Sequence, residues 1–216
     1  KNFEGEGIKL LVYKKPADPR SPWTTELADG DLHVTHNLEP VDWDQDPEQE
    51  VLLAAKEGVF LLDRIPGAPA APGNWTRTQL GGNGPGETAF KGSSEICTGR
   101  LPGGKRFIAT VEPFHGNKVV VYTPRAGGSA AAGGGGATPG TAPSLWKRAE
   151  IDDTLAEGHA VACADLAGAE SEQILAGWRK KDRNGKVGIR MYTPADPEGS
   201  MWSRSLLDDD GMACED

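Results

Sequence analysis

The sequence lacks any apolar run that approaches the length of a membrane span, and its first residues do not read as a signal peptide. It is also short of positive charge, because 23 lysines and arginines stand against 32 aspartates and glutamates, a net charge of −9. This balance argues against a nucleic-acid backbone or an anionic membrane surface as the partner, and it leaves carbohydrates and metal ions open. Aromatic residues make up 6% of the chain, which is low for a compact α/β enzyme.

Cysteine is scarce as well, with Cys97, Cys163 and Cys214 in the whole chain. Three cysteines allow no even pairing, and neither C-x-x-C nor C-x-x-H occurs, so the cysteines offer no zinc motif. Each lies at a similar place in a repeated unit, and equivalent strands of neighbouring units are too well separated for a bond to be assumed. We therefore predict buried, unpaired thiols, with a disulfide as the alternative. Unpaired thiols favour a cytoplasmic location.

Glycine and proline are abundant, with 29 and 16 residues, as expected where many short strands need many turns. The clearest unit extends from Gly158 to Trp202. Its sequence predicts a strand that begins at His159, strands at Ile174–Trp178 and Val187–Tyr192, and a fourth around Trp202. Four short strands joined by turns, repeated with a period of roughly 50 residues, are typical of a β-propeller blade.

Further copies of this unit can be followed along the chain. Tyr13 precedes a tryptophan by ten residues, as Tyr192 does, and one tryptophan marks each unit: Trp23, Trp75, Trp146 and Trp202. A Gly/Ala-rich insertion at residues 126–143 interrupts the third copy and is predicted to be a disordered loop. We predict an all-β fold in which residues 1–216 belong to one β-propeller domain. About three to four four-stranded antiparallel blades are present, a sector of a longer propeller.

An acidic segment follows the first inner strand. Carboxylates at alternating positions are the pattern preferred by a hard cation such as Ca²⁺ or Mg²⁺, and the proposed metal ligands are Asp42, Asp44, Asp46 and Glu50. Pro47 occupies the tight turn where a glycine would be expected. The alternative is a solvated acidic turn without a metal.

Two of the four histidines share one register, since His36 precedes Asp42 by six residues and His159 precedes Asp165 by six. We expect both at the axis-facing ends of inner strands. His115 lies in a turn followed by Gly-Asn, where the backbone can approach a ligand closely. Imidazole serves readily as a base or metal ligand near neutral pH, although each histidine could instead be structural.

Three residues other than histidine are further candidates for the functional site. Arg179 could stabilise a carbonyl or a developing enolate oxygen, or it could be a charge at the end of a strand. Glu95 and Glu112 are weaker candidates. His33 is expected to be structural.

Several segments resemble a known family: S-S-E-I-C-T-G-R-L, R-F-I-A-T-V-E-P-F-H-G-N-K-V-V-V-Y-T-P, I-D-D-T-L-A-E-G-H-A-V-A-C-A-D-L, I-L-A-G-W-R and D-D-G-M-A-C-E-D. They look like the β-propeller domain of the aldos-2-ulose dehydratase (pyranosone dehydratase) family and its FG-GAP/VCBS-like relatives. The resemblance implies a seven-bladed propeller, which in that family can be followed by cupin-like domains. It also implies a divalent metal and the elimination of water from 1,5-anhydro-D-fructose or aldosuloses.

The leading functional hypothesis is a carbon–oxygen lyase that acts on a small carbohydrate. His159 or His115 would remove a proton beside a carbonyl, and Arg179 or a divalent metal would stabilise the enediolate. One alternative is a propeller polysaccharide lyase, and another is a non-catalytic FG-GAP-like propeller that binds sugars or proteins. No organic cofactor is expected, and a homodimer is left open.

Overall fold

The computed structural model describes residues 4–65, 74–82, 91–125 and 146–215, and within them the chain forms fourteen β-strands and no helix. The described residues therefore contain no helix with the length and apolar character needed to cross a membrane. The predicted all-β fold of four-stranded antiparallel sheets is confirmed. The insertion 126–143 lies outside the described residues.

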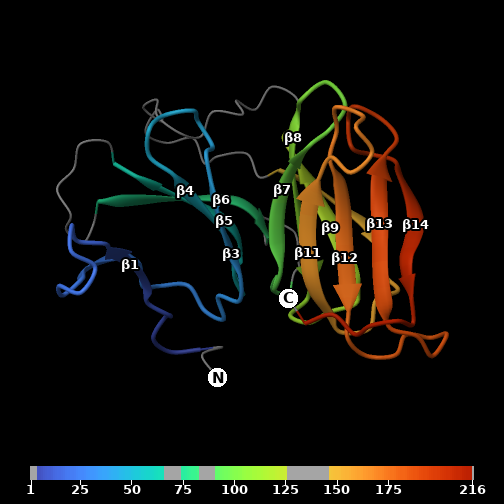
Figure 1. Ribbon diagram of the computed structural model, residues 1–216, viewed down its shortest axis with the longest axis horizontal. Helices are drawn as coiled ribbons and strands as arrows, with labels where there is room; N and C mark the ends of the chain where they lie inside the picture. The colour runs from blue at the N-terminus through green and yellow to red at the C-terminus, as the bar shows by residue number, and fades with distance from the viewer. Residues whose placement is uncertain (1–3, 66–73, 83–90, 126–145, 216) are drawn as a thin grey trace.

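Within the described residues, one two-stranded sheet and three four-stranded sheets are each joined in chain order by antiparallel pairing (Figure 1). The two-stranded sheet consists of β1 (Leu10–Lys14) and β2 (Thr24–Asp29). The first four-stranded sheet consists of β3 (Leu38–Val41), β4 (Glu50–Ala54), β5 (Gly58–Arg64) and β6 (Trp75–Gly82). The second consists of β7 (Ile96–Arg100), β8 (Arg106–Glu112), β9 (Lys118–Thr123) and β10 (Lys147–Asp152). The third consists of β11 (Gly158–Ala164), β12 (Gln173–Trp178), β13 (Gly188–Pro194) and β14 (Trp202–Asp209).

The third sheet follows the strands predicted from its sequence closely. In the β12–β13 hairpin, Ile174 pairs with Tyr192 and Trp178 pairs with Gly188. The turn between them holds Gly185 at φ 76°, a left-handed conformation that glycine adopts without steric cost. The glycine in the turn and the apolar runs on both sides of it therefore favour the same pairing of β12 with β13.

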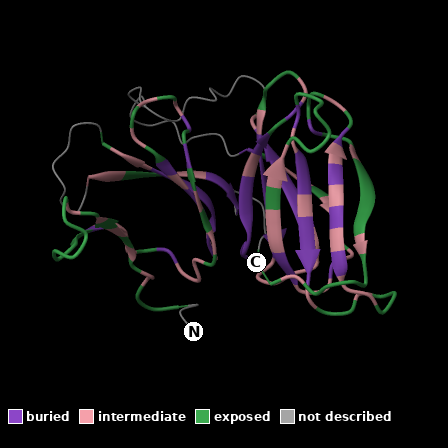
Figure 2. Cartoon of the chain, viewed as in Figure 1, coloured by how far each residue is buried: buried purple, intermediate pink, exposed green. Residues whose placement is uncertain are grey.

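The sheets pack face to face, so their middle strands are buried on both sides. Figure 2 shows the contrast between such strands and the outer strand β14, which is exposed along most of its length. One apolar cluster lies between the first and second sheets and includes Leu52, Ile108 and Tyr122. A second cluster lies between the second and third sheets and includes Phe107 and Trp178. The second interface holds β7 and β11 side by side near the middle of the molecule (Figure 1).

The four tryptophans that were predicted to mark repeats lie at the start of the last strand of their sheets. Trp75 opens β6 and Trp202 opens β14, while Trp146 directly precedes β10 and Trp23 directly precedes β2. Their burial differs, since Trp146 is buried and Trp23 is exposed. A shared place in the strand order therefore does not impose a shared degree of packing.

The prediction of three unpaired thiols is wrong for two of them. Cys97 in β7 and Cys163 in β11 form a disulfide, with their Cα atoms 6.1 Å apart. Cys214 is a free, partly buried cysteine. Equivalent strands of neighbouring units were predicted to be too far apart for a bond, but β7 and β11 lie in direct contact. The bond also removes the premise on which the cytoplasmic location rested.

A buried tyrosine–carboxylate–arginine network recurs in the second and third sheets. Tyr122 donates to Glu112 at 2.6 Å, and Arg148 donates to the other carboxylate oxygen of Glu112 at 2.6 Å. Tyr192 and Arg204 likewise donate to Asp152, both to its Oδ2, at 2.7 and 2.9 Å. Because Glu112 is satisfied inside this network, its position supports the structural interpretation over the functional one.

Candidate functional site

Three of the four histidines, each from a different segment, come together in one cluster. The ring centroids of His115 and His159 are 4.0 Å apart, those of His36 and His115 are 4.5 Å apart, and those of His36 and His159 are 5.9 Å apart. His33 instead pairs with Glu57 through its Nδ1 at 2.7 Å. The residues His36, His115 and His159, together with Glu95, are called the histidine cluster below.

Backbone hydrogen bonds bring the three segments to the same place. His36 lies two residues before β3, and its amide donates to the carbonyl of Ala54 at the end of β4. His115 lies in the β8–β9 turn with φ 45°, an unusual conformation for a residue other than glycine. The next residue, Gly116, accepts a hydrogen bond from the amide of Gly158 at 2.8 Å. This bond joins the turn to the first residue of β11, so His115 is held against His159.

Glu95, the residue before β7, places a buried carboxylate against His36. Its Oε1 lies 3.0 Å from Nδ1 of His36, and its Oε2 accepts a hydrogen bond from the Asn37 side chain at 2.6 Å. Burial alone would raise the pKa of Glu95, but the hydrogen bonds from His36 and Asn37 outweigh it and lower that pKa. Glu95 is therefore an ionised acceptor that orients the His36 ring, with Nε2 directed away from the carboxylate.

His115 differs from His36 because no carboxylate compensates its charge directly. Burial lowers the pKa of His115, and the positive charge that His159, His36 and Arg179 can carry lowers it further. Its Nδ1 is buried and has no hydrogen-bond partner within the described part of the chain. His115 is thus held as a neutral imidazole near neutral pH, the form that can accept a proton or bind a metal.

His159 and Arg179 both lie close to Glu215. His159 is buried, and its Nε2 lies 3.8 Å from Glu215. Arg179 follows β12 and donates to Glu157 at 2.9 Å and to Glu215 at 3.0 Å. Lys180 also pairs with Glu157. Arg179 lies close enough to affect the charge of His115, but two carboxylates already share its own charge.

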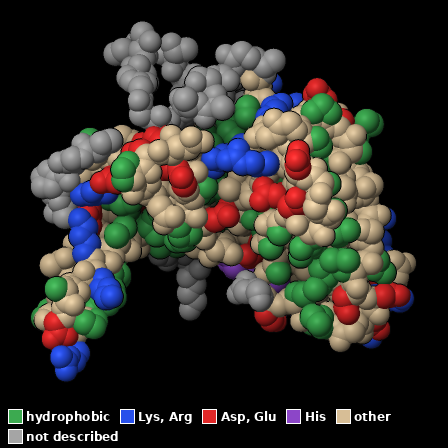
Figure 3. All heavy atoms as spheres, turned by 45° about the horizontal axis from the view of Figure 1, so that its top comes forward, with side chains coloured by type: hydrophobic (Ala, Val, Ile, Leu, Met, Phe, Trp, Pro, Cys, Tyr) green, Lys and Arg blue, Asp and Glu red, His purple; other side chains and the backbone are tan. Residues whose placement is uncertain are grey.

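A cavity of about 460 Å³ lies beside the cluster. Asn37, Glu95 and Glu215 contribute its polar groups, and Ala160, Ala162 and Leu175 are among its apolar lining residues. This volume falls within the range of roughly 300–1,000 Å³ that is typical of small-molecule sites. On the face shown in Figure 3, imidazole surface appears only as a small patch in the recess between the two halves of the molecule.

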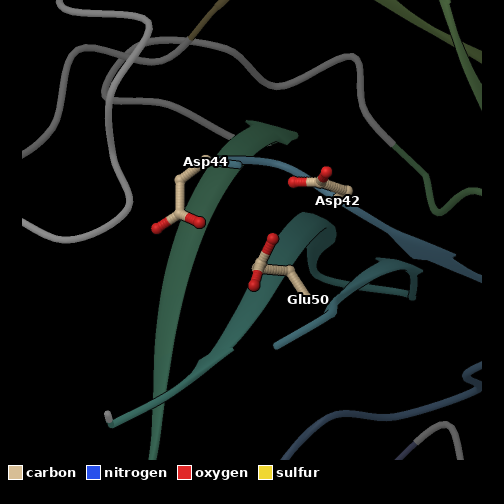
Figure 4. A group of neighbouring side chains, drawn as sticks. All are labelled: Asp42, Asp44 and Glu50. Atoms are coloured by element: carbon tan, nitrogen blue, oxygen red, sulfur yellow. The ribbon is translucent and has the colours of Figure 1, made fainter. Parts of the chain in front are cut away.

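The acidic segment of the β3–β4 connection forms a second, separate site. Asp42, Asp44 and Glu50 each place a carboxylate oxygen within 4.8 Å of the others, and their side chains face one another (Figure 4). Burial raises the pKa of Glu50, and neighbouring carboxylates, Asp44 first among them, raise it further. Asp46, the fourth predicted ligand, does not belong to this group; its Oδ1 accepts the amide of Glu48 at 2.7 Å.

The histidine cluster offers two kinds of chemistry. A neutral imidazole beside an oriented carboxylate–imidazole pair is suited to accept a proton from a substrate. Three imidazoles and a carboxylate are also the donor set that Zn²⁺ and similar divalent metals take up, and the unpartnered Nδ1 of His115 fits such a role.

Sequence reasoning brought the three histidines forward but underrated Glu95 and overlooked Asn37 and Glu215. One available signal was strand parity. Ser93 occupies the register position of the two inner-strand histidines, and Glu95 is two residues later, so both lie on the same side of an extended chain. Glu215 had no such signal, because it reaches Arg179 from a segment 36 residues away.

No protein-family model matches the chain. Among curated proteins, the chain is similar to the aldos-2-ulose dehydratase of Phanerodontia chrysosporium, with 26% identity over 216 residues. The matched region is 92% of this chain and 22% of that protein. The chain therefore spans less than a quarter of the length of this relative.

Proposed function

We propose that the protein is a carbon–oxygen lyase that removes water from a keto-sugar, such as an aldos-2-ulose or 1,5-anhydro-D-fructose. The observation that carries the proposal is the convergence of His36, His115 and His159 with the buried Glu95 beside a cavity of sugar-compatible size. Similarity to a protein named aldos-2-ulose dehydratase supports the same reaction class.

The reaction begins with transfer of a proton from the carbon next to the substrate carbonyl to a ring nitrogen of His115. Its lowered pKa keeps this imidazole unprotonated and ready to accept. The electron pair of the broken C–H bond moves into the carbonyl and forms an enediolate. When that pair returns, it forms a carbon–carbon double bond, and the hydroxyl on the β-carbon departs and takes up a proton, so that water is released.

The negative charge of the enediolate must be stabilised inside the cluster. His36, oriented by Glu95, and His159 are the two imidazoles close enough to His115 to face the same substrate atom. A divalent metal held by the three imidazoles and Glu95 would polarise the carbonyl oxygen and stabilise the enediolate. Arg179 is the weaker candidate for this role, because Glu157 and Glu215 already neutralise it.

The architecture proposed with this function is a sector of a β-propeller, in which the three four-stranded sheets are successive blades. Their identical strand order and their face-to-face packing support it. In this arrangement β3, β7 and β11 are the inner strands, and His36, Glu95 and His159 lie at or next to the beginnings of those strands.

The proposal is tested by incubating the chain with 1,5-anhydro-D-fructose and following the ultraviolet absorbance of the enone product. We expect His115→Gln to lower kcat by roughly 10²–10⁴-fold, the usual contribution of a positioned acid–base group. His159→Ala is expected to reduce turnover while leaving the melting temperature little changed. The matched control is His33→Gln, because His33 lies outside the cluster and is paired with Glu57.

The outcomes of this assay distinguish the lyase from the non-catalytic alternative. Turnover by the wild type that is lost in His115→Gln and kept in His33→Gln supports the lyase. Turnover that survives in both His115→Gln and His159→Ala contradicts the proposed base. Sugar binding without any turnover would favour the non-catalytic alternative.

A further inference from the structure

We propose that Asp42, Asp44 and Glu50 form a calcium site in the β3–β4 connection, separate from the histidine cluster. Each of the three side chains has a carboxylate oxygen within 4.8 Å of the others, and the three carboxylates point into a common space (Figure 4). Two oxygens on opposite sides of a bound Ca²⁺ are separated by about 4.6–5.2 Å, twice the metal–oxygen distance. The spacing already present in the structure therefore suits this ion.

Glu50 is the observation that distinguishes this group from an ordinary acidic turn. Its side chain is 1% exposed, and while Oε2 accepts the amide of Trp43 at 2.6 Å, Oε1 is buried without a hydrogen-bond partner among the residues that the structure describes. An unsatisfied buried carboxylate oxygen is costly, and a cation facing it would remove that cost. Asp42 and Asp44 supply the other two anionic donors on the solvent side.

The nearby arginines bind other groups, so the negative charge of the three carboxylates is available to a divalent cation. Arg64 is occupied by Glu48, to which it donates at 2.9 Å. Arg106 donates to the carbonyl oxygens of Asp42 and Trp43 at 3.1 and 3.3 Å, so these bonds go to the backbone and not to the three carboxylates. Carboxylates this close repel one another, and a divalent ion would offset the repulsion.

The site is tied to the packing of the first two sheets. The guanidinium of Arg106 lies 4.3 Å from the centre of the Trp43 ring, and Trp43 lies 5.6 Å from Trp146. A cation bound by Asp42 and Asp44, on either side of Trp43, would fix the loop that carries this ring. We therefore expect Ca²⁺ binding to stabilise the folded protein.

Terbium(III), which takes the same oxygen ligands as Ca²⁺, gives a direct test, because the indole of Trp43 can transfer excitation energy to it. We expect tryptophan-sensitised terbium luminescence in the metal-free wild-type protein, its loss on addition of excess Ca²⁺, and a rise in melting temperature with Ca²⁺. Asp44→Asn and Glu50→Gln should each weaken binding by roughly tenfold or more, because affinity depends on the number of charged ligands.

The matched control is Asp165→Asn, in the corresponding loop of the third sheet, where Asp165 accepts backbone amides of Ala169 and Glu170. It should bind terbium as the wild type does. Circular dichroism confirms that each variant is folded, and Asp44→Asn keeps the test decisive if Glu50→Gln is unstable. Equal binding by wild type and Asp44→Asn, or no effect of Ca²⁺ on luminescence and melting, would overturn the proposal. Displacement by Mg²⁺ but not Ca²⁺ would also overturn it.

Discussion

At the scale of single residues, the imidazole of His115 is kept neutral mainly by its burial and then by neighbours that can carry positive charge. The stacked partner His159, 4.0 Å away, is the closest of these neighbours in the cluster. Glu95 acts in the opposite direction, but more weakly. Protonation of His115 is therefore harder in the folded protein than in an unfolded chain.

The pH dependence of turnover follows from this arrangement. If His115 is the base, kcat/KM should fall on the acidic side only below the ordinary imidazole pKa of 6.5. The free energy of unfolding should decrease over the same acidic range, because the unfolded chain binds this proton more readily. Arg179→Met should move the acidic limb of the kcat/KM profile toward pH 6.5, because the loss of a nearby positive charge raises the pKa of His115. A limb above 6.5 in the wild type would contradict the assignment.

At the scale of elements, the disulfide between Cys97 and Cys163 connects β7 with β11, the strands that begin just after Glu95 and at Gly158. These strands belong to different sheets and share no ladder hydrogen bonds. The bond is therefore a covalent link across a contact that is otherwise made by side-chain packing.

Reduction of this bond should lower the free energy of unfolding by about 4 kcal/mol, the value that the chain-entropy relation gives for cysteines 66 residues apart. Chemical denaturation with and without a reductant measures the difference. The experiment is best done in Cys214→Ser, so that the free cysteine cannot exchange with the bond. An unchanged midpoint after complete reduction would show that the sheets are held without it.

At the scale of the whole molecule, the stability of the fold depends on the two interfaces between neighbouring sheets. Phe107 on β8 is fully buried, and its ring lies 5.2 Å from that of Trp202 on β14 in the adjacent sheet. Removing this ring would leave a cavity in the apolar packing between the second and third sheets.

Phe107→Ala should therefore destabilise the protein by about 3–5 kcal/mol, as is usual for a large buried aromatic residue. Leu206→Ala on the exposed strand β14 serves as the control and should change stability by no more than about 0.5 kcal/mol. Urea denaturation of both variants checks the comparison. Similar effects of the two changes would contradict the sheet-to-sheet packing.

The order of the strands was predictable because it depends on local chemistry. The apolar run at Ile174–Trp178, the glycine-containing turn after it and the apolar run that follows specify a hairpin whatever the rest of the chain does. The boundaries were less accurate where the signal was weak. The strand predicted at Val187–Tyr192, for example, extends from Gly188 to Pro194 in the structure.

The sequence by itself therefore determined the all-β fold, the four-stranded antiparallel sheets and the equal spacing of His36 from Asp42 and of His159 from Asp165, since these depend on periodicity and spacing. Only the tertiary structure decided which units touch. It joined Cys97 to Cys163 and brought Glu95 to His36 across 59 residues of sequence. Such contacts depend on how one sheet packs on the next, and no local pattern within a single sheet specifies that packing.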